Sequence, residues 1–364
     1  MGMKAWVLHG VNDIRYEDVD IPMLDPKEVC VNVKAAGICG SDIPRIYETG
    51  AHKMPLIPGH EFSGVVEGIG KEVNPYWMRK RVGVYPLIPC GKCKPCKSGH
   101  PEMCRDYDYI GSRRDGAFAE YVAVPVDNLT EIPENVSFEQ AAMLEPMAVA
   151  VHAMRKGVGE NDKIVVCGLG TIGLLLTMFL TERGYKNIFV IGNKDTQRNR
   201  AVSIGISPNN FCDSASEDVV KWLQETVGGA DVYFECVGKN ECVSYGVDGT
   251  APGGRIVLVG NPHSDMSLSR EVYWQILRNQ LQLFGTWNSS FSLAGIDSSS
   301  DEEGTETEDA ETGDDWHYVL RRLEQGRISP SDFITHRYAL EDLNQGFHIM
   351  RDKTEDYCKI MMVR

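Results

Sequence analysis

The pattern of apolar and polar positions divides the chain into three zones. In the first, from residue 3 to about residue 150, short β-rich runs are separated by Gly, Pro and Asp. The runs are KAWVLHG, EVCVNVKAAG, FSGVVEGIG, RVGVYPLI and FAEYVAVP. Short strands interrupted by turn residues predict an irregular antiparallel barrel.

A different pattern occupies the second zone, residues 151–287. The runs KIVVCGLG, NIFVIG, DVYFECVG and GGRIVLVG are almost continuously apolar, and TIGLLLTMFLTERG after the first of them is typical of a helix. Buried strands that alternate with helices indicate an α/β fold with a parallel, doubly wound sheet.

The third zone begins near residue 288 with an acidic segment. It continues with a predicted helix (WHYVLRRLEQG), a strand-like run (FITHRYAL), a short helix and a closing run, KIMMVR. These last elements are more similar to the first zone than to the second.

Composition narrows the classes of function. A chain of 364 residues with 42% apolar and 24% charged residues is typical of a globular protein of about two domains. The longest mostly apolar stretch, Ile172 to Leu180, is far shorter than the roughly 20 residues of a membrane span, so no membrane segment is expected. The net charge of −15 argues against nucleic acid or an anionic membrane as partner. Ten of the acidic residues lie between Asp297 and Asp315 with no basic residue among them, which predicts a mobile insertion at 297–315.

Four cysteines in a lobe at residues 90–104 carry the clearest chemistry. The spacing C-x2-C-x2-C-x7-C fits a closed tetrahedral zinc site, which is structural because no position is open to substrate. Disulfides are the weaker alternative, since the chain shows no secretory signal and its odd total of 11 cysteines indicates a reduced, cytoplasmic protein. A ferredoxin-like cluster does not match the spacing before the fourth cysteine. The predicted zinc ligands are Cys90, Cys93, Cys96 and Cys104.

A glycine motif in the second zone lies between a predicted strand and a predicted helix. In this context G-x-G-x-x-G is a dinucleotide fingerprint, because glycines allow the backbone to approach the pyrophosphate at the helix N-terminus. A Gly-rich turn without a ligand is the alternative. The residues assigned to the cofactor are Gly168, Gly170, Thr171, Ile172 and Gly173.

The end of the next strand favours NADP over NAD. NAD enzymes place an acidic residue here for the ribose hydroxyl, whereas this chain has Gly192, Asn193 and Lys194, followed by Arg198. Glycine makes room for a 2′-phosphate, and the cations can bind it. Asp195 could still reach the ribose in a shifted turn, and the cations could be solvated charges at a helix start.

A second group of possible metal ligands lies in the first zone. Cys39, His60 and Glu145 combine a thiolate, an imidazole and a carboxylate, which would leave one zinc position open for substrate. Spacing alone does not decide this, because a single Cys and a single His are also common in cores.

These motifs together resemble a known family. GICGSD around Cys39, GHE at residues 59–61, the four-cysteine lobe and the glycine fingerprint follow the order of the zinc-containing medium-chain alcohol and polyol dehydrogenases. DYIGSRRDG at residues 108–116 is similar to the galactitol-1-phosphate 5-dehydrogenase branch. The resemblance implies a GroES-like catalytic domain (1–150 and 288–364) interrupted by a Rossmann domain (151–287).

Site roles follow from the same resemblance. It implies one catalytic zinc held by Cys39, His60 and Glu145, beside one structural zinc in the lobe. Glu61 would lie beside the metal, Ser41 would relay the substrate proton, and Asp42 would orient the imidazole of His60. The relay histidine of many family members is replaced by Pro44, so the proton must leave by another route.

The expected partner is a small polyol or polyol phosphate, with hydride passing to the nicotinamide. Arg113 and Arg114 are the candidate phosphate-binding residues, since paired guanidinium groups suit phosphate. They could instead pair with Asp106, Asp108 or Asp115. The alternative substrates are an unphosphorylated polyol of the sorbitol or idonate type and L-threonine. The alternative outside the enzymes is a catalytically silent relative with a structural or regulatory role. The family resemblance implies a homodimer or homotetramer.

Overall fold

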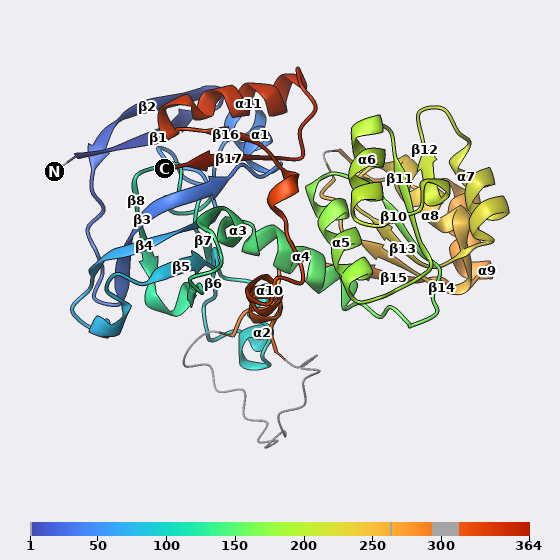
Figure 1. Ribbon diagram of the computed structural model, residues 1–364, viewed down its shortest axis with the longest axis horizontal. Coiled ribbons are helices and arrows are strands. Elements are labelled where there is room, and N and C mark those ends of the chain that lie inside the picture. The colour runs from blue at the N-terminus through green and yellow to red at the C-terminus, as the bar shows by residue number, and fades with distance from the viewer. Residues whose placement is uncertain (1, 263, 293–312) are drawn as a thin grey trace. The chain divides into compact units, whose positions relative to one another are not determined.

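The computed structural model describes residues 2–262, 264–292 and 313–364 (Figure 1). The chain forms two compact units. The first consists of Met1–Ala148 together with Ser289–Arg364, and the second of Val149–Asn288. The chain therefore leaves the first unit, builds the second and returns.

A seven-stranded sheet organises the first unit. Its order is β16-β17-β3-β4-β5-β9, and β8 also pairs with β3. The strands are β3 (Glu28–Gly37), β4 (Glu61–Ile69), β5 (Arg81–Val84), β8 (Tyr121–Pro125), β9 (Leu129–Glu131), β16 (Ile334–Tyr338) and β17 (Lys359–Val363). Two separate antiparallel pairs accompany it, β1 (Gly2–Gly10) with β2 (Asp13–Asp20), and the two-residue strands β6 (Leu87–Ile88) and β7 (Asp108–Tyr109).

Pairing within this sheet is antiparallel with one exception. β16 and β17 run parallel, because helix α11 (Leu343–Asp352) lies between them in the chain and forms the crossover connection that parallel strands need. The strand pairs of this sheet that lie within residues 3–150 are all antiparallel, as predicted for that zone. The helices that begin in this unit are α1 (Asp42–Pro44), α2 (Lys94–Lys97), α3 (Phe138–Ala142), α4 (Leu144–Met154), α10 (Asp315–Glu324) and α11 (Leu343–Asp352).

The core of the first unit joins distant parts of the chain. Apolar side chains of β3, among them Val31 and Val33, are fully buried with Phe62, Phe118 and Phe347. Phe347 belongs to α11, so the C-terminal segment completes the core that the N-terminal strands begin. Each buried aromatic ring contributes about 2–3 kcal/mol by leaving water.

The second unit is a doubly wound α/β domain. Its six-stranded sheet has the order β12-β11-β10-β13-β14-β15, and every pair is parallel. The strands are β10 (Ile164–Cys167), β11 (Ile188–Gly192), β12 (Phe211–Asp213), β13 (Ala230–Glu235), β14 (Thr250–Leu258) and β15 (Gln282–Gly285). The helices are α5 (Thr171–Glu182), α6 (Asp195–Ser203), α7 (Val219–Trp222), α8 (Asn240–Gly249) and α9 (Arg270–Arg278).

The strand order reverses between β10 and β13. Right-handed crossovers on either side of this point place α5 and α6 on one face and α8 and α9 on the other, as Figure 1 shows. Ligands of such sheets bind beyond the carboxyl ends of the strands at this reversal. In the described part of the chain, no helix combines the length and the apolar character needed to cross a membrane.

Candidate active site and metal centres

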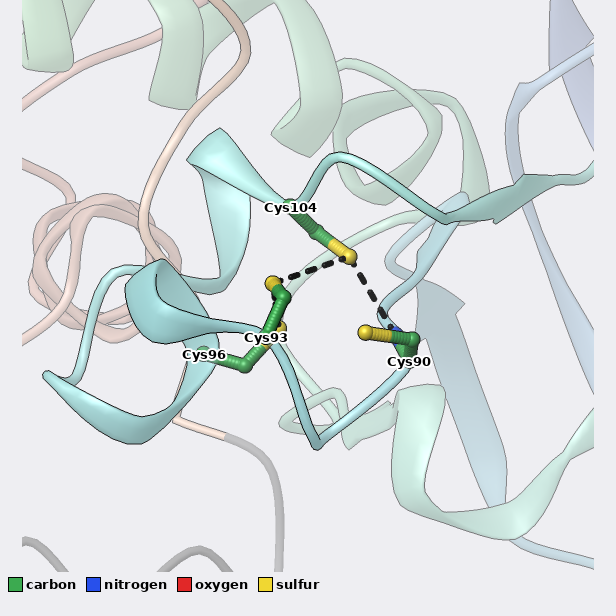
Figure 2. A group of neighbouring side chains, drawn as sticks. All are labelled: Cys90, Cys93, Cys96 and Cys104. Carbon is green, nitrogen blue, oxygen red and sulfur yellow. Dashed lines mark hydrogen bonds between the residues drawn. The ribbon is translucent and has the colours of Figure 1, made fainter.

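The four lobe cysteines converge on one point. Their sulfur atoms all lie within 4.8 Å of one another, and Figure 2 shows them turned toward a common centre. Cys93 Sγ lies 3.4 Å from Cys96 Sγ and 3.8 Å from Cys104 Sγ. Four sulfurs bound tetrahedrally to zinc at about 2.3 Å are about 3.8 Å apart, so the donors and the geometry fit this ion.

Local turns make this arrangement. Cys93 caps the single-turn helix α2, and Gly91 and Gly99 take left-handed backbone angles of 66° and 77°. Backbone N–H groups of Cys96 and Arg105 lower the pKa of Cys93 to about 6, which favours a thiolate. Burial raises the pKa of Cys96 to about 12, so only a bound cation would hold all four sulfurs ionised.

The structure also assembles the second group of ligands. Cys39, His60 and Glu61 offer ligand atoms that all lie within 4.8 Å of one another. Cys39 follows β3, and His60 and Glu61 stand at the start of its neighbour β4, so the sheet pairing brings them together. Glu61 therefore joins this group directly, whereas the predicted third ligand, Glu145, lies outside it.

Glu145 lies close to this group and is held by a tyrosine. The Tyr109 hydroxyl donates to Glu145 Oε1 at 3.4 Å, and the Tyr109 ring packs edge-on against His60 with 5.7 Å between centroids. Burial, and then the charge of Glu61, raise the pKa of Glu145 to about 7. Its role as a zinc ligand stays a prediction.

Asp42 supports both His60 and Cys39. Its side chain is fully buried, with Oδ1 3.5 Å from His60 Nδ1 and Oδ2 accepting the backbone N–H of Cys39 at 3.0 Å. The Arg45 guanidinium compensates the negative charge of Asp42, with Nη1 2.5 Å from Oδ1. Because Asp42 faces Nδ1, the other ring nitrogen of His60 is left for a metal. The Ser41 hydroxyl lies 3.3 Å from Cys39 Sγ, beside the same group.

Lys359 is a site residue that the sequence did not reveal. It begins β17, is only 3% exposed, and donates to Glu61 Oε2 at 2.5 Å and to the carbonyl of Ile38 at 3.2 Å. A lysine in a closing strand carries no motif, and the only available signal was a lone cation before the apolar run IMMV.

The charges of this group fit a cation. Arg45 pairs with Asp42 and Lys359 pairs with Glu61, whereas neither the Cys39 thiol nor the Glu145 carboxyl forms an ion pair with a lysine or arginine among the described residues. Nearby Asp42 and Cys39 raise the pKa of His60 even though burial opposes this. A divalent cation would neutralise the excess negative charge.

The glycine fingerprint has the three-part geometry of a dinucleotide site. Gly168 takes a φ of +96°, and a Cβ there would lie 2.4 Å from the Val237 side chain, so only glycine fits this turn. A Cβ on Gly173 would lie 1.9 Å from the carbonyl oxygen of Gly168, so the glycine allows the start of α5 to pack closely against the end of β10. Gly170 caps α5 and has open space where a Cβ would be. Thr171 and Ile172 form the first turn, so the backbone of this turn is accessible to a pyrophosphate.

The residues after β11 are less open than the sequence suggested. A Cβ on Gly192 would lie 2.8 Å from Gln197 Oε1 and 3.0 Å from the Phe211 ring. Asn193 donates its backbone N–H to Gln197 Oε1, and Lys194 caps α6 ahead of Asp195. The Arg198 guanidinium lies 4.4 Å above the Phe211 ring. These cations stand at the carboxyl end of β11, where the adenosine ribose is bound in this type of fold.

The turn that carries the two arginines packs against the metal-site segment. A Cβ on Gly111 or Gly116 would lie within 2.4 Å of the carbonyl oxygen of Gly59, the residue before His60. Hydrogen bonds from Gly116 N to Ile57 O (2.7 Å) and from Ala117 N to Gly59 O (2.9 Å) fix this contact. The predicted phosphate-binding turn therefore lies beside a candidate metal ligand.

Comparisons with known proteins agree with this geometry. Residues 25–134 match the alcohol dehydrogenase GroES-like domain, and residues 171–298 match the zinc-binding dehydrogenase domain. Galactitol 1-phosphate 5-dehydrogenase of Escherichia coli (strain K12) is 32% identical over 94% of this chain and 95% of the relative. L-idonate 5-dehydrogenase of Vitis vinifera is 33% identical over 95% of this chain and 90% of its own length.

Solved structures give the same result. The crystal structure of galactitol-1-phosphate dehydrogenase from E. coli has a TM-score of 0.86 at 30% identity, with both chains fully covered. A zinc-binding dehydrogenase of Sinorhizobium meliloti 1021 bound to NADP has a TM-score of 0.86 at 26% identity, again with full coverage. The predicted family, the α/β fold and the oxidoreductase class are thereby confirmed. The chain belongs to the zinc-dependent medium-chain alcohol and polyol dehydrogenases.

Proposed function

We propose that this dehydrogenase oxidises a polyol phosphate similar to galactitol 1-phosphate, or reduces the matching ketose phosphate, with NADP(H). The observation that carries the proposal is that the Gly111–Gly116 turn, which contains Arg113 and Arg114, packs its backbone against the segment of His60. A guanidinium group on a turn that adjoins a metal site suits a substrate that is anionic at one end and an alcohol at the other.

In the proposed reaction the alcohol carbon gives a hydride to the nicotinamide and its hydroxyl loses a proton. Zinc, when bound, supplies a Lewis acid that polarises the substrate oxygen. Cys39, His60 and Glu145 or Glu61 would hold it, and Asp42 fixes the orientation of His60. The Ser41 hydroxyl lies 3.3 Å from Cys39 Sγ and would relay this proton from the substrate oxygen to water, since Pro44 has no group that could relay it further.

We also infer two metal ions per chain with different roles. The lobe offers four sulfurs and no open position, so its ion would be structural. The group around Cys39 combines different donors at the edge of β3 and β4, which suits an ion that must accept a substrate oxygen. Metal analysis of active protein tests this count.

NADP preference is supported by charge. Lys194 and Arg198 follow β11, and Gly192 places no carboxylate at its end. Asp195 lies in the first turn of α6, after the cap, rather than at the strand end. A 2′-phosphate bound at the end of β11 would therefore lie close to the cations of Lys194 and Arg198 rather than to a carboxylate.

Exposed apolar side chains of the second unit support a homo-oligomer. Its sheet ends at β15, where Leu283 is 40% exposed, and α9, the helix before β15 in the chain, exposes Tyr273, Trp274 and Leu277. An edge strand with neighbouring apolar side chains can pair with its own copy about a two-fold axis. The proposed homodimer or homotetramer would be seen as a multiple of the 40.5 kDa chain in light scattering.

One assay decides the substrate class. Galactitol 1-phosphate, galactitol, sorbitol, idonate and L-threonine are each tested with NADP and NAD, and kcat/KM is compared. The proposal expects the phosphate ester with NADP to exceed every other pair. Faster turnover of free idonate would favour the second candidate, which the grape relative supports at 33% identity.

A further inference from the structure

We propose that Arg113, and not its neighbour Arg114, is the residue that selects a phosphorylated substrate. This inference rests on the proposed function, because it assigns the phosphate to one residue of the Gly111–Gly116 turn. The two guanidinium groups are adjacent in sequence but have different surroundings, and these determine which of them is available to an anion.

Arg114 is already paired. Its Nη2 lies 2.5 Å from Glu28 Oε1, and the Glu28 side chain is only 8% exposed. The other oxygen of Glu28 accepts the backbone N–H of Asp25 at 3.1 Å, at the entry to β3. Removing Arg114 would leave a buried carboxylate without its cation, so this residue has a structural role.

Arg114 also faces a different part of the unit. It lines a cavity of about 430 Å³ whose walls include Val7, Met23 and Tyr121. Neither Cys39 nor His60, Glu61 or Glu145 lines this cavity. An anion bound there would not be held against the candidate metal centre.

Arg113 is not paired with a carboxylate within the described residues. Its guanidinium carbon lies 4.5 Å from the centroid of the Tyr107 ring, in a cation–π contact. The three aspartates that could have bound it are engaged elsewhere. Asp106 lies 3.7 Å from Lys92 Nζ, Asp108 accepts the N–H of Tyr109, and Asp115 accepts the N–H of Ile57.

A row of aromatic rings connects Arg113 to the metal site. Tyr107 packs edge-on against Tyr109, with 6.2 Å between centroids, and Tyr109 packs edge-on against His60. The backbone N–H of Arg113 also donates to the carbonyl of Tyr109 at 2.9 Å. The backbone of Arg113 is thus fixed to the tyrosine that contacts His60 and donates to Glu145, while its guanidinium lies over the neighbouring Tyr107 ring.

This arrangement provides selectivity on physical grounds. A guanidinium stacked on a ring keeps its N–H edge available and loses little further entropy when it binds a phosphate. The bound phosphate would then fix the distance between the anionic end of the substrate and the alcohol to be oxidised. A neutral polyol cannot make this contact.

The test compares Arg113→Ala with the matched control Arg114→Ala, and kcat/KM is measured for galactitol 1-phosphate and for galactitol with NADP. Arg113→Ala should lower the ratio of kcat/KM for galactitol 1-phosphate to kcat/KM for galactitol by about 10- to 100-fold, which is the effect of losing a charge-assisted contact. Arg113→Lys should recover part of it. Arg114→Ala should lower the melting temperature but keep the ratio within about twofold, and Arg114→Lys covers the case in which the alanine variant does not fold.

The assignment would be overturned if the ratio of the two kcat/KM values fell in Arg114→Ala and not in Arg113→Ala. It would also be overturned if the ratio were unchanged in both variants. Inorganic phosphate, as a competitive inhibitor of polyol oxidation, separates this failure from that of the proposed function. If the parent enzyme shows no preference for the phosphate ester but Arg113→Ala still weakens inhibition by phosphate, then only the substrate proposal fails. Inhibition that does not depend on Arg113 would overturn the inference itself.

Discussion

The two candidate metal centres of the first unit are built by opposite routes. All four donors of the lobe lie in residues 90–104, and short turns bring their sulfurs together. The donors around Cys39 lie at the ends of two neighbouring strands, β3 and β4, and a fully buried aspartate and a lysine from the last strand hold them in place.

This difference predicts different roles for the ions. The lobe is built from short turns whose hydrogen bonds lie largely within residues 90–104, so its metal should contribute to folding. The residues around Cys39 are fixed by the sheet whether or not a metal is bound, so loss of that metal should affect chemistry before stability.

The largest expected effect is on turnover. Cys39→Ser should lower kcat by about 10³-fold or more, because a Lewis acid contributes several kcal/mol to the stabilisation of the transition state. Circular dichroism and the melting temperature should change little, and metal analysis should show one zinc fewer per chain. A variant that retains turnover would remove Cys39 from the candidate site.

A second large effect should come from the lysine that the sequence did not reveal. Lys359→Met leaves the buried Glu61 without its cation and should reduce the free energy of unfolding by about 3–5 kcal/mol. Urea denaturation measures it. Arg337→Ala, which breaks the partly exposed pair with Glu139, is the matched control and should cost about 1 kcal/mol or less. Equal losses in the two variants would show that Lys359 is not needed for the site.

The lobe should respond to substitution in the opposite way to Cys39. Cys93→Ser should remove one zinc and reduce stability by several kcal/mol, while the folded fraction keeps its kcat. Cys30→Ala, a buried cysteine of the same unit outside both metal groups, should keep both ions and cost about 1 kcal/mol. Loss of kcat in folded Cys93→Ser protein would contradict the separation of roles.

Cofactor choice should show a smaller effect. Lys194→Ala and Arg198→Ala should each lower the preference for NADP over NAD by about 10-fold, the value of one charge-assisted contact. Gly192→Asp is a poorer test, because its side chain would crowd Gln197 and Phe211 whatever the cofactor. Lys239→Ala, which breaks an exposed pair with Glu241 in the same unit, is the control and should leave the preference unchanged.

The same contrast explains what the sequence could predict. Local spacing identified the four cysteines and the glycine fingerprint, because a few adjacent residues make each motif. Strands with continuous apolar runs, such as β10 and β13, were also identified. β2 was missed since its sequence DIRYEDVD is mostly charged and half-exposed, so it has no clear apolar alternation. Lys359 and the pairing of Arg114 with Glu28 depend on contacts across the whole chain, which no local pattern records.

The predicted acidic insertion shows the limit of a charge pattern. Its residues 297–312 lie outside the described residues, whereas Asp314 and Asp315 are ordered at the start of α10. Asp314 caps the helix and Asp315 is fully buried, so neither is part of a mobile segment. Composition alone could not separate capping carboxylates from those next to them.

The smallest effect is expected from removing residues 293–312 and joining the ends with a short Gly-Ser linker. The two ends are already bound to each other, since Ser290 and Ser292 donate their N–H groups to Asp315 and Asp314 at 2.7 and 2.8 Å. Both metal ions should remain, and kcat/KM should stay within about threefold of the parent value, because ordinary surface changes cost less than about 0.5 kcal/mol. Asp315→Ala is the contrasting variant, and loss of its buried hydrogen bonds should cost about 1–3 kcal/mol. If the deletion costs more than this single substitution, the segment contributes to folding and the acidic run is not a dispensable insertion.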